Sequence, residues 1–132
     1  MLLKEKIIKE KNILICGDDK RASNFLQGFL RGEGYDAVDI ARSRDEALEK
    51  IAKERYQLVL LDIKLQGMNG IQTLQRIKEI DKNIAVIIIA DPSQVELAEK
   101  AVKNGAYDYV LKPFDLAYLK LAILTKVLVD SK

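Results

Sequence analysis

Apolar runs and segments of helical spacing alternate along this chain. Five short runs are rich in apolar and β-branched residues, as expected of strands that are buried on both faces. They are Asn12–Cys16, Asp36–Ala41, Gln57–Asp62, Ile84–Ala90 and Tyr107–Lys112. After each run, apolar residues recur at helical intervals. The predicted helices are Lys20–Arg31, Ser43–Ala52, Ile71–Ile80, Ser93–Asn104 and Phe114–Leu128, the second and fourth opened by the capping boxes Ser43/Glu46 and Ser93/Glu96.

Five strand–helix repeats predict an α/β fold. Strands buried on both faces belong in a parallel sheet with helices on each side, so we predict a doubly wound, five-stranded parallel sheet. Residues 12–132 are assigned to this one domain, which has an ordinary domain length. Residues 1–11 form a predicted N-terminal basic arm, which we interpret as a solvated tail. The arm contains Lys4, Lys6, Lys9 and Lys11 against Glu5 and Glu10.

Composition and charge exclude several classes of protein. Apolar residues make up 48% of the 132 positions, which is enough for a core, and the formal net charge is only +2. The basic arm accounts for that charge (four lysines minus two glutamates), so the predicted domain is neutral, which argues against direct nucleic-acid binding. With no histidine and a single cysteine, Cys16, a zinc site and an internal disulfide are excluded, in keeping with a cytoplasmic location. No apolar run approaches the ~20 residues of a membrane span.

Charged residues stand where several of the predicted strands end. Asp18 and Asp19 follow the first strand, Asp62 ends the third, Asp91 follows the fourth and Lys112 ends the fifth. In an open parallel sheet, ligands bind beyond the carboxyl ends of the strands, so these groups should converge. Two carboxylates ~4 Å apart repel by about 4 kcal/mol at an effective dielectric near 20, and Mg²⁺ with its oxygen ligands would offset this. With a fixed lysine charge and a carboxylate nucleophile, the pattern predicts phosphoryl transfer to an aspartate.

Five segments, in the same order, resemble the motifs of response-regulator receiver domains from two-component signalling. They are Asp18-Asp19, Asp62 after its apolar run, Met68-Asn69-Gly70, Gly105-Ala106-Tyr107-Asp108 and Lys112-Pro113-Phe114. The resemblance runs from about Asn12 to Leu128 and points to receivers of regulators that activate sigma-54 transcription. It implies a flavodoxin-like strand order, 2-1-3-4-5. It also implies a signalling domain that catalyses only its own phosphorylation and dephosphorylation, not a conventional enzyme.

The resemblance assigns roles to the charged residues. Asp62 would accept a phosphoryl group from a sensor histidine kinase or a phosphotransfer protein, and Lys112 would contact that group. Asp19 and Asp62 would bind Mg²⁺ directly, Asp18 through a water molecule and Lys64 through its backbone carbonyl. The fourth predicted helix, the fifth strand and the last helix would form the partner face, and the apolar last helix is also a candidate homodimer surface.

Two positions depart from the family pattern. Most receivers have threonine or serine where this chain has Ala90, and the following residue, usually small, is Asp91. The missing hydroxyl normally couples the phosphoryl group to an aromatic switch residue, which the resemblance places at Tyr109. We therefore hypothesise a weakly gated receiver, in which Tyr109 turns inward without phosphate and Asp91 pairs with Lys112 until phosphate arrives. The Lys112–Pro113 peptide bond is often cis in the family.

Other functions fit the pattern less well. A pseudo-receiver, which binds partners without phosphorylation, is favoured by Ala90 and Asp91 and opposed by the otherwise complete set of acids and lysine. A flavin- or nucleotide-binding protein of the same topology would need phosphate-binding donors after the first strand, whereas Gly17-Asp18-Asp19 would repel phosphate. A phosphatase with an aspartate nucleophile would need a cap over its substrate, for which we find no segment.

Overall fold

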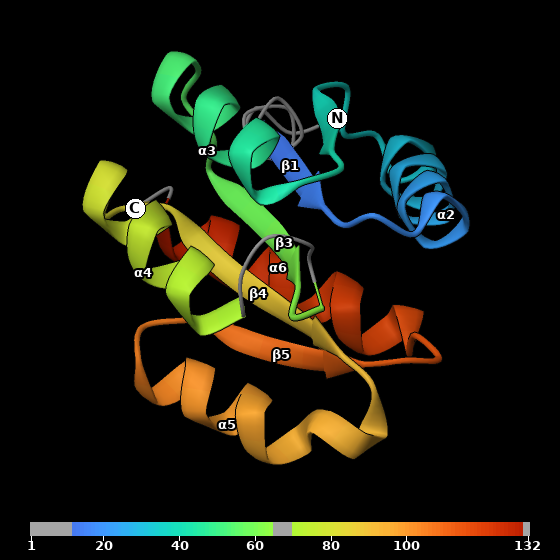
Figure 1. Ribbon diagram of the computed structural model, residues 1–132. Coiled ribbons are helices and arrows are strands. Elements are labelled where there is room, and N and C mark those ends of the chain that lie inside the picture. Colours follow the sequence, from blue (N-terminus) through green and yellow to red (C-terminus); the bar gives the residue numbers. More distant parts are fainter. Residues whose placement is uncertain (1–11, 65–69, 131–132) are drawn as a thin grey trace.

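Five parallel strands form one sheet in the order β2-β1-β3-β4-β5 (Figure 1). The computed structural model describes residues 12–64 and 70–130, the last five of these by their backbone alone. The strands are β1 (Ile13–Cys16), β2 (Val38–Ala41), β3 (Leu58–Asp62), β4 (Ala85–Ala90) and β5 (Asp108–Leu111). The predicted flavodoxin-like order is confirmed, and each predicted strand end lies within two residues of the observed one.

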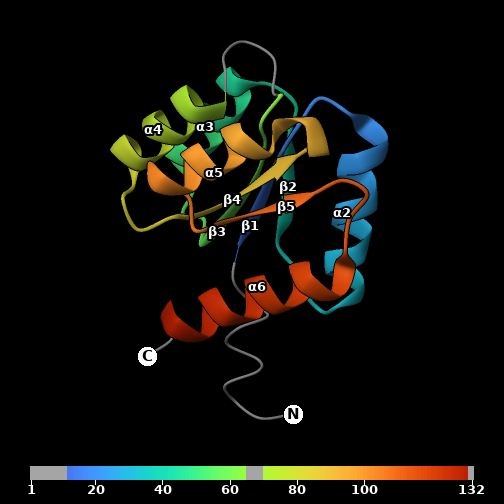
Figure 2. The ribbon, with the colours of Figure 1, turned by 90° about the horizontal axis from the view of Figure 1, so that it is seen from below.

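Helices cover both faces of the sheet, as predicted for a doubly wound fold. They are α2 (Lys20–Gly32), α3 (Arg44–Lys53), α4 (Gly70–Ile80), α5 (Val95–Lys103) and α6 (Leu116–Asp130), with a short 3₁₀ helix, η1 (Pro92–Gln94), before α5. Figure 2 shows α2 and α6 on one face and α3, α4 and α5 on the other. The carboxyl ends of all five strands therefore meet at one edge of the sheet, between two layers of helices.

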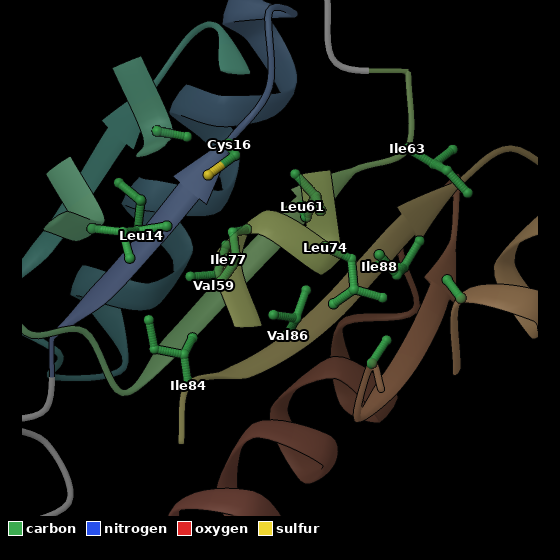
Figure 3. Close-up of a cluster of buried hydrophobic side chains, with 14 of the residues drawn as sticks. Leu14, Cys16, Val59, Leu61, Ile63, Leu74, Ile77, Ile84, Val86 and Ile88 are labelled. Atoms are coloured by element: carbon green, nitrogen blue, oxygen red, sulfur yellow. The ribbon is translucent and has the colours of Figure 1, made fainter. Parts of the chain in front are cut away.

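The alternation of side chains along each strand divides the core into two clusters. In β1, Ile13 and Ile15 face α2 and α6, whereas Leu14 and Cys16 face α3 and α4. Figure 3 shows the cluster that contains Leu14 and Cys16, in which side chains of the central strands pack against Leu74 and Ile77 of α4. Burial raises the pKa of the Cys16 thiol, so Cys16 is a core residue and not a reactive thiol.

The starts of two helices differ in how well the sequence predicted them. At α3, the Ser43 hydroxyl accepts a hydrogen bond from the Glu46 N–H at 3.2 Å, as a capping box requires. The predicted box of Ser93 and Glu96 is wrong. The chain instead turns into η1 at Asp91, whose N–H donates to Gln94 Oε1 at 3.0 Å. Proline is favoured in the first turn of a helix, so Pro92 moves the start upstream.

Some predictions concern residues that lie elsewhere than expected or outside the described structure. Phe25, whose position fits the helical spacing of the apolar residues of α2, is nevertheless 52% exposed. Its ring stacks on Phe114, with centroids 6.4 Å apart and planes 5° apart. The basic arm, residues 1–11, and Met68-Asn69 of the quoted motif fall outside the described residues.

Candidate functional site

Asp62, the last residue of β3, is a buried carboxylate with two defined partners. Asp62 as a whole is 7% exposed to solvent. Oδ1 accepts a hydrogen bond from the Lys64 backbone N–H at 2.9 Å, and Oδ2 lies 2.9 Å from the Lys112 ammonium. A buried charge is tolerated only when it is paired and hydrogen-bonded, and both oxygens of Asp62 meet that condition.

Lys112 reaches Asp62 from the far side of β4. It follows β5, and its backbone N–H donates to the carbonyl of Ala90, the last residue of β4, at 2.9 Å. Because β4 lies between β3 and β5, the side chain of Lys112 passes the end of β4 before it meets Asp62. The Lys112–Pro113 peptide bond is cis, as the family resemblance led us to expect.

The end of β1 brings a second carboxylate to the same place. A Cβ atom at Gly17 would lie 3.5 Å from the Cβ atom of Asp62, so the two strand ends are in close contact. Asp19 caps α2, since its Oδ1 accepts from the Ala22 N–H at 3.2 Å. Asp19, Asp62 and Lys112 line one small cavity of about 10 Å³. Asp18 is exposed beside them and does not line this cavity.

The oxygen donors at this site fit a Mg²⁺ ion that keeps part of its water shell. Among the described residues, no group of three or more acidic, cysteine or histidine side chains is close enough together to hold a metal ion. Asp19 and Asp62 nevertheless line a shared cavity, and carboxylate oxygens are the ligands that Mg²⁺ prefers. The set suits an ion that keeps several waters and shares a substrate phosphate, because Mg²⁺ is seldom bound by a closed protein cage.

The predicted pairing of Asp91 with Lys112 is wrong. The carboxylate of Asp91 pairs with the ammonium of Lys64, and Lys112 pairs with Asp62. The side chain of Asp62 is 10% exposed and that of Asp91 is 29% exposed, so the more deeply buried carboxylate has the greater need of Lys112. The hydrogen bond and charge of Lys64 lower the pKa of Asp91, and the charge of Lys112 adds to this.

Ala90 and Tyr109 lie on the same face of the sheet. Ala90 is buried at the end of β4, and Tyr109 of β5 is half-buried against the same core cluster. In the sheet register, Tyr109 is opposite Ile88, two residues before Ala90 along β4. The structure therefore brings together the two positions of the proposed switch, while the turning of Tyr109 stays a prediction.

The side chain of Lys64 is the site feature that sequence reasoning missed. Only its backbone carbonyl was assigned a role, because nothing in the spacing indicated a partner for its ammonium. The hydrogen bond to Asp91 and the charge of Asp91 raise the pKa of Lys64, and the charge of Asp62 adds a smaller increase. Its position two residues after Asp62 was a signal that its charge would lie close to the site.

An open parallel sheet with acids and a lysine converging at its carboxyl edge is the arrangement expected of a receiver. The family model of the response regulator receiver domain matches residues 13–124, and this chain belongs to that family. Within the described part of the chain, a membrane-spanning helix is absent.

Two relatives illustrate the range of proteins that share this domain. The transcriptional regulatory protein ZraR of Escherichia coli (strain K12) is 42% identical over 120 residues, which are 91% of this chain and 27% of ZraR. The sporulation initiation phosphotransferase F of Bacillus subtilis (strain 168) is 36% identical over 113 residues, which are 86% of this chain and 90% of that protein. The chain thus spans about a quarter of ZraR and nearly all of the phosphotransferase.

The fold is also similar to the folds of solved receiver-domain structures. The receiver domain of NtrX from Brucella abortus superposes with a TM-score of 0.83 at 32% identity, covering 88% of this chain and 98% of that one. A CheY-like response regulator receiver domain protein from Methanospirillum hungatei JF-1 gives 0.82 at 31% identity, covering 89% and 94%. The match to ZraR, a transcriptional regulatory protein, agrees with the predicted resemblance to receivers of transcription regulators.

Proposed function

We propose that Asp62 accepts a phosphoryl group from a phosphohistidine of a sensor kinase or a phosphotransfer protein. The observation that carries this proposal is the convergence of Asp62, Lys112 and Asp19 on one cavity at the carboxyl edge of the sheet. The sites of such domains lie at this edge, and a carboxylate can serve as a phosphoryl acceptor. The domain would work in the cytoplasm, where sensor kinases expose their phosphohistidines.

The transfer is a displacement at phosphorus. An oxygen of the Asp62 carboxylate forms the new P–O bond, the P–N bond of the phosphohistidine breaks, and the imidazole nitrogen keeps its electron pair. The product is an acyl phosphate on Asp62 and a free imidazole. Lys112, already 2.9 Å from Oδ2, would stay beside the group and balance the added negative charge.

The acids around Asp62 fit a role in metal binding. Asp19, Asp62 and the Lys64 carbonyl would hold Mg²⁺, with Asp18 acting through a water molecule. When bound, the ion would supply positive charge next to the phosphoryl oxygens. The protein itself contributes the fixed positions of these groups, since Asp62 is anchored by Lys64 N–H and Asp19 is anchored as the cap of α2.

The proposed output surface consists of α5, β5 and α6. Three large apolar side chains are exposed around β5 and α6, namely Tyr107 at 37%, Tyr118 at 45% and Leu121 at 62%. Two adjoining hollows of about 370 and 460 Å³ lie there and share Asp108 and Tyr118 in their walls. Exposed apolar groups next to hollows favour protein contact, so this face would bind a downstream target or a second copy of the domain.

Labelling with a small phosphodonor tests the proposal. Acetyl phosphate and Mg²⁺ should add the mass of one phosphoryl group to the wild-type protein, and none to Asp62→Asn, as read by intact mass spectrometry. Chelation of Mg²⁺ should prevent the labelling. An adduct of equal yield in Asp62→Asn would contradict the assignment of the acceptor.

The second candidate, a pseudo-receiver, is favoured by one observation. Ala90 is buried at the end of β4 and has no hydroxyl to offer a phosphoryl group. On that account the partner face would be formed constitutively, and wild-type protein would bind its partner equally well before and after incubation with acetyl phosphate. The paired and buried carboxylate of Asp62 makes the phosphorylated receiver the stronger proposal.

A further inference from the structure

An ion pair bridges the two loops that flank the Asp62 carboxylate. Lys64 lies two residues after Asp62, and Asp91 directly follows β4. Through its backbone N–H, Lys64 binds Oδ1 of Asp62 at 2.9 Å, and through its ammonium it binds Asp91. One residue therefore contacts both the proposed acceptor and the first residue beyond β4.

Asp91 is also connected to the proposed output surface. Its N–H donates to Gln94 Oε1 at 3.0 Å, and its carbonyl accepts from the Gln94 N–H at 2.8 Å. Gln94 is the last residue of η1, and α5 begins at the next residue, Val95. Figure 1 shows β4 leading through this turn into α5. A displacement of Asp91 would thus act on the first turn of α5.

The carboxylates of Asp62 and Asp91 are each paired with a lysine before phosphorylation. The carboxylates of Asp62 and Asp91 face the ammonium groups of Lys112 and Lys64, which form the two ion pairs described above. A phosphoryl group brings further negative charge and three acceptor oxygens. It would repel the carboxylate of Asp91 and attract the ammonium of Lys64. The side chain of Lys64 is flexible, and the backbone N–H of the same residue is bound to Asp62.

We propose that phosphorylation moves the Lys64 ammonium from Asp91 to the phosphoryl group, and that the released Asp91 passes the signal to η1 and α5. This exchange of ion pairs rests on the proposed function and connects the phosphorylation site to α5 by a route that does not involve position 90. Lys64 is then a contact residue of the phosphoryl group. Asp91 is a positioning residue that holds Lys64 while the site is unphosphorylated.

The test uses beryllofluoride with Mg²⁺ as a phosphoryl mimic and follows backbone amides by NMR. Lys64→Met removes the ammonium and keeps the backbone N–H and carbonyl. Asp91→Asn removes the carboxylate charge and keeps the shape. Lys53→Met is the matched control, because Lys53 forms an exposed ion pair with Glu49 on α3, away from the site.

In wild type and Lys53→Met, beryllofluoride should shift the amides of Asp62 and of the first turn of α5. In Lys64→Met, Asp62 should still respond, while the ratio of switched to unswitched α5 falls about tenfold, the usual scale of coupling between sites. In Asp91→Asn without beryllofluoride, the amides of the first turn of α5 should already have chemical shifts near those of wild type with beryllofluoride.

The outcomes separate this inference from the proposed function. A full α5 response in Lys64→Met, together with a normal response of Asp62, would overturn the ion-pair exchange alone. So would an unliganded Asp91→Asn whose α5 amides match those of wild type. No response of Asp62 in wild type would overturn the proposed function and the exchange with it.

Discussion

The Nζ atom of Lys112 lies 2.9 Å from the Oδ2 atom of Asp62, although fifty residues separate the two along the chain. The contact exists because β3, β4 and β5 are consecutive in a parallel sheet, so their carboxyl ends are neighbours. It pairs a buried carboxylate with a cation that would remain in place when the carboxylate becomes an acyl phosphate. Both the resting state and the proposed product of the domain depend on this pair.

Magnesium binding should depend on the charge of Asp19. Asp19→Asn keeps the cap of α2, because asparagine caps helices as well as aspartate does, but it removes a proposed metal ligand. We expect Mg²⁺ affinity to fall by more than about tenfold, since even outer-shell partners of metal ligands cost that much when mutated. Titration calorimetry measures the affinity.

Two further variants complete this test. Asp18→Asn should weaken Mg²⁺ binding less, and Asp19→Ala should in addition lower the free energy of unfolding by about 1 kcal/mol through loss of the cap. Equal Mg²⁺ affinity in wild type and Asp19→Asn would remove Asp19 from the site.

The contact between Gly70 and Ile63 leaves no room for a side chain at the start of α4. A Cβ atom at Gly70 would lie 2.9 Å from the Cα atom of Ile63 and 2.7 Å from its Cγ1. Gly70→Ala should therefore lower the free energy of unfolding by roughly 1–3 kcal/mol, as overpacking does. Gly28→Ala is the control, because Gly28 lies within α2 with nothing within 4 Å, and alanine should raise stability there by about 0.5–1 kcal/mol. Urea denaturation of both variants checks the prediction, and a Gly70→Ala protein as stable as wild type would contradict it.

The hydroxyl of Tyr118 should ionise unusually late. Its hydrogen bond to the Asp108 carboxylate, together with partial burial and the charge of Asp108, raises the pKa of Tyr118 from 10.0 to about 12. The neutral form is favoured in the folded state, so this stabilisation is complete below pH 10 and is lost as the pH rises towards 12. ¹³C NMR of labelled tyrosine rings measures the titration, with Tyr118→Phe to assign the signal. Asp108→Asn should bring the pKa back towards 10.0, and an unchanged pKa in that variant would refute the stated cause.

The missing hydroxyl at Ala90 should limit switching. With beryllofluoride bound, wild type should show an incomplete change of the Tyr109 ring signals by NMR, and Ala90→Thr a complete one. A hydrogen bond to a charged group is worth about 1.5–3 kcal/mol, so its absence weakens coupling by roughly tenfold to a hundredfold. Ala90→Val matches the shape of threonine without the hydroxyl and should behave like wild type. If wild type changes as completely as Ala90→Thr, the hydroxyl is not limiting.

Sequence periodicity was sufficient to predict the sheet and the edge of the sheet at which the candidate site residues lie. The apolar runs identified all five strands, and the rule that ligands collect at the carboxyl edge selected Asp18, Asp19, Asp62, Asp91 and Lys112. Of these five residues, Asp19, Asp62 and Lys112 line one cavity. The structure adds that Asp62 and Lys112 are in direct contact and that Asp19 caps a helix. These details depend on side-chain conformation, which spacing does not determine.

Most of the wrong predictions concern residues whose contacts depend on the geometry of a loop. Asp91 was expected to pair with Lys112, but pairing depends on which carboxylate is more deeply buried and which ammonium is nearer. The start of α5 was placed at Ser93, although Asp91-Pro92 with Gln94 offered a competing start that the structure uses. Phe25 fits the helical spacing of the apolar residues of α2 but is exposed, and the aromatic ring that it stacks on, that of Phe114, lies far away in sequence.

The most direct test of the account is to locate the phosphoryl group in the wild-type protein. After incubation with acetyl phosphate and Mg²⁺, sodium borohydride reduces an acyl phosphate to the alcohol, which converts the labelled aspartate to homoserine. Peptide mass spectrometry then identifies the residue without any mutation that could redirect the label. The account predicts conversion at Asp62 alone. Conversion at Asp18, Asp19 or Asp91 with Asp62 unchanged would contradict it.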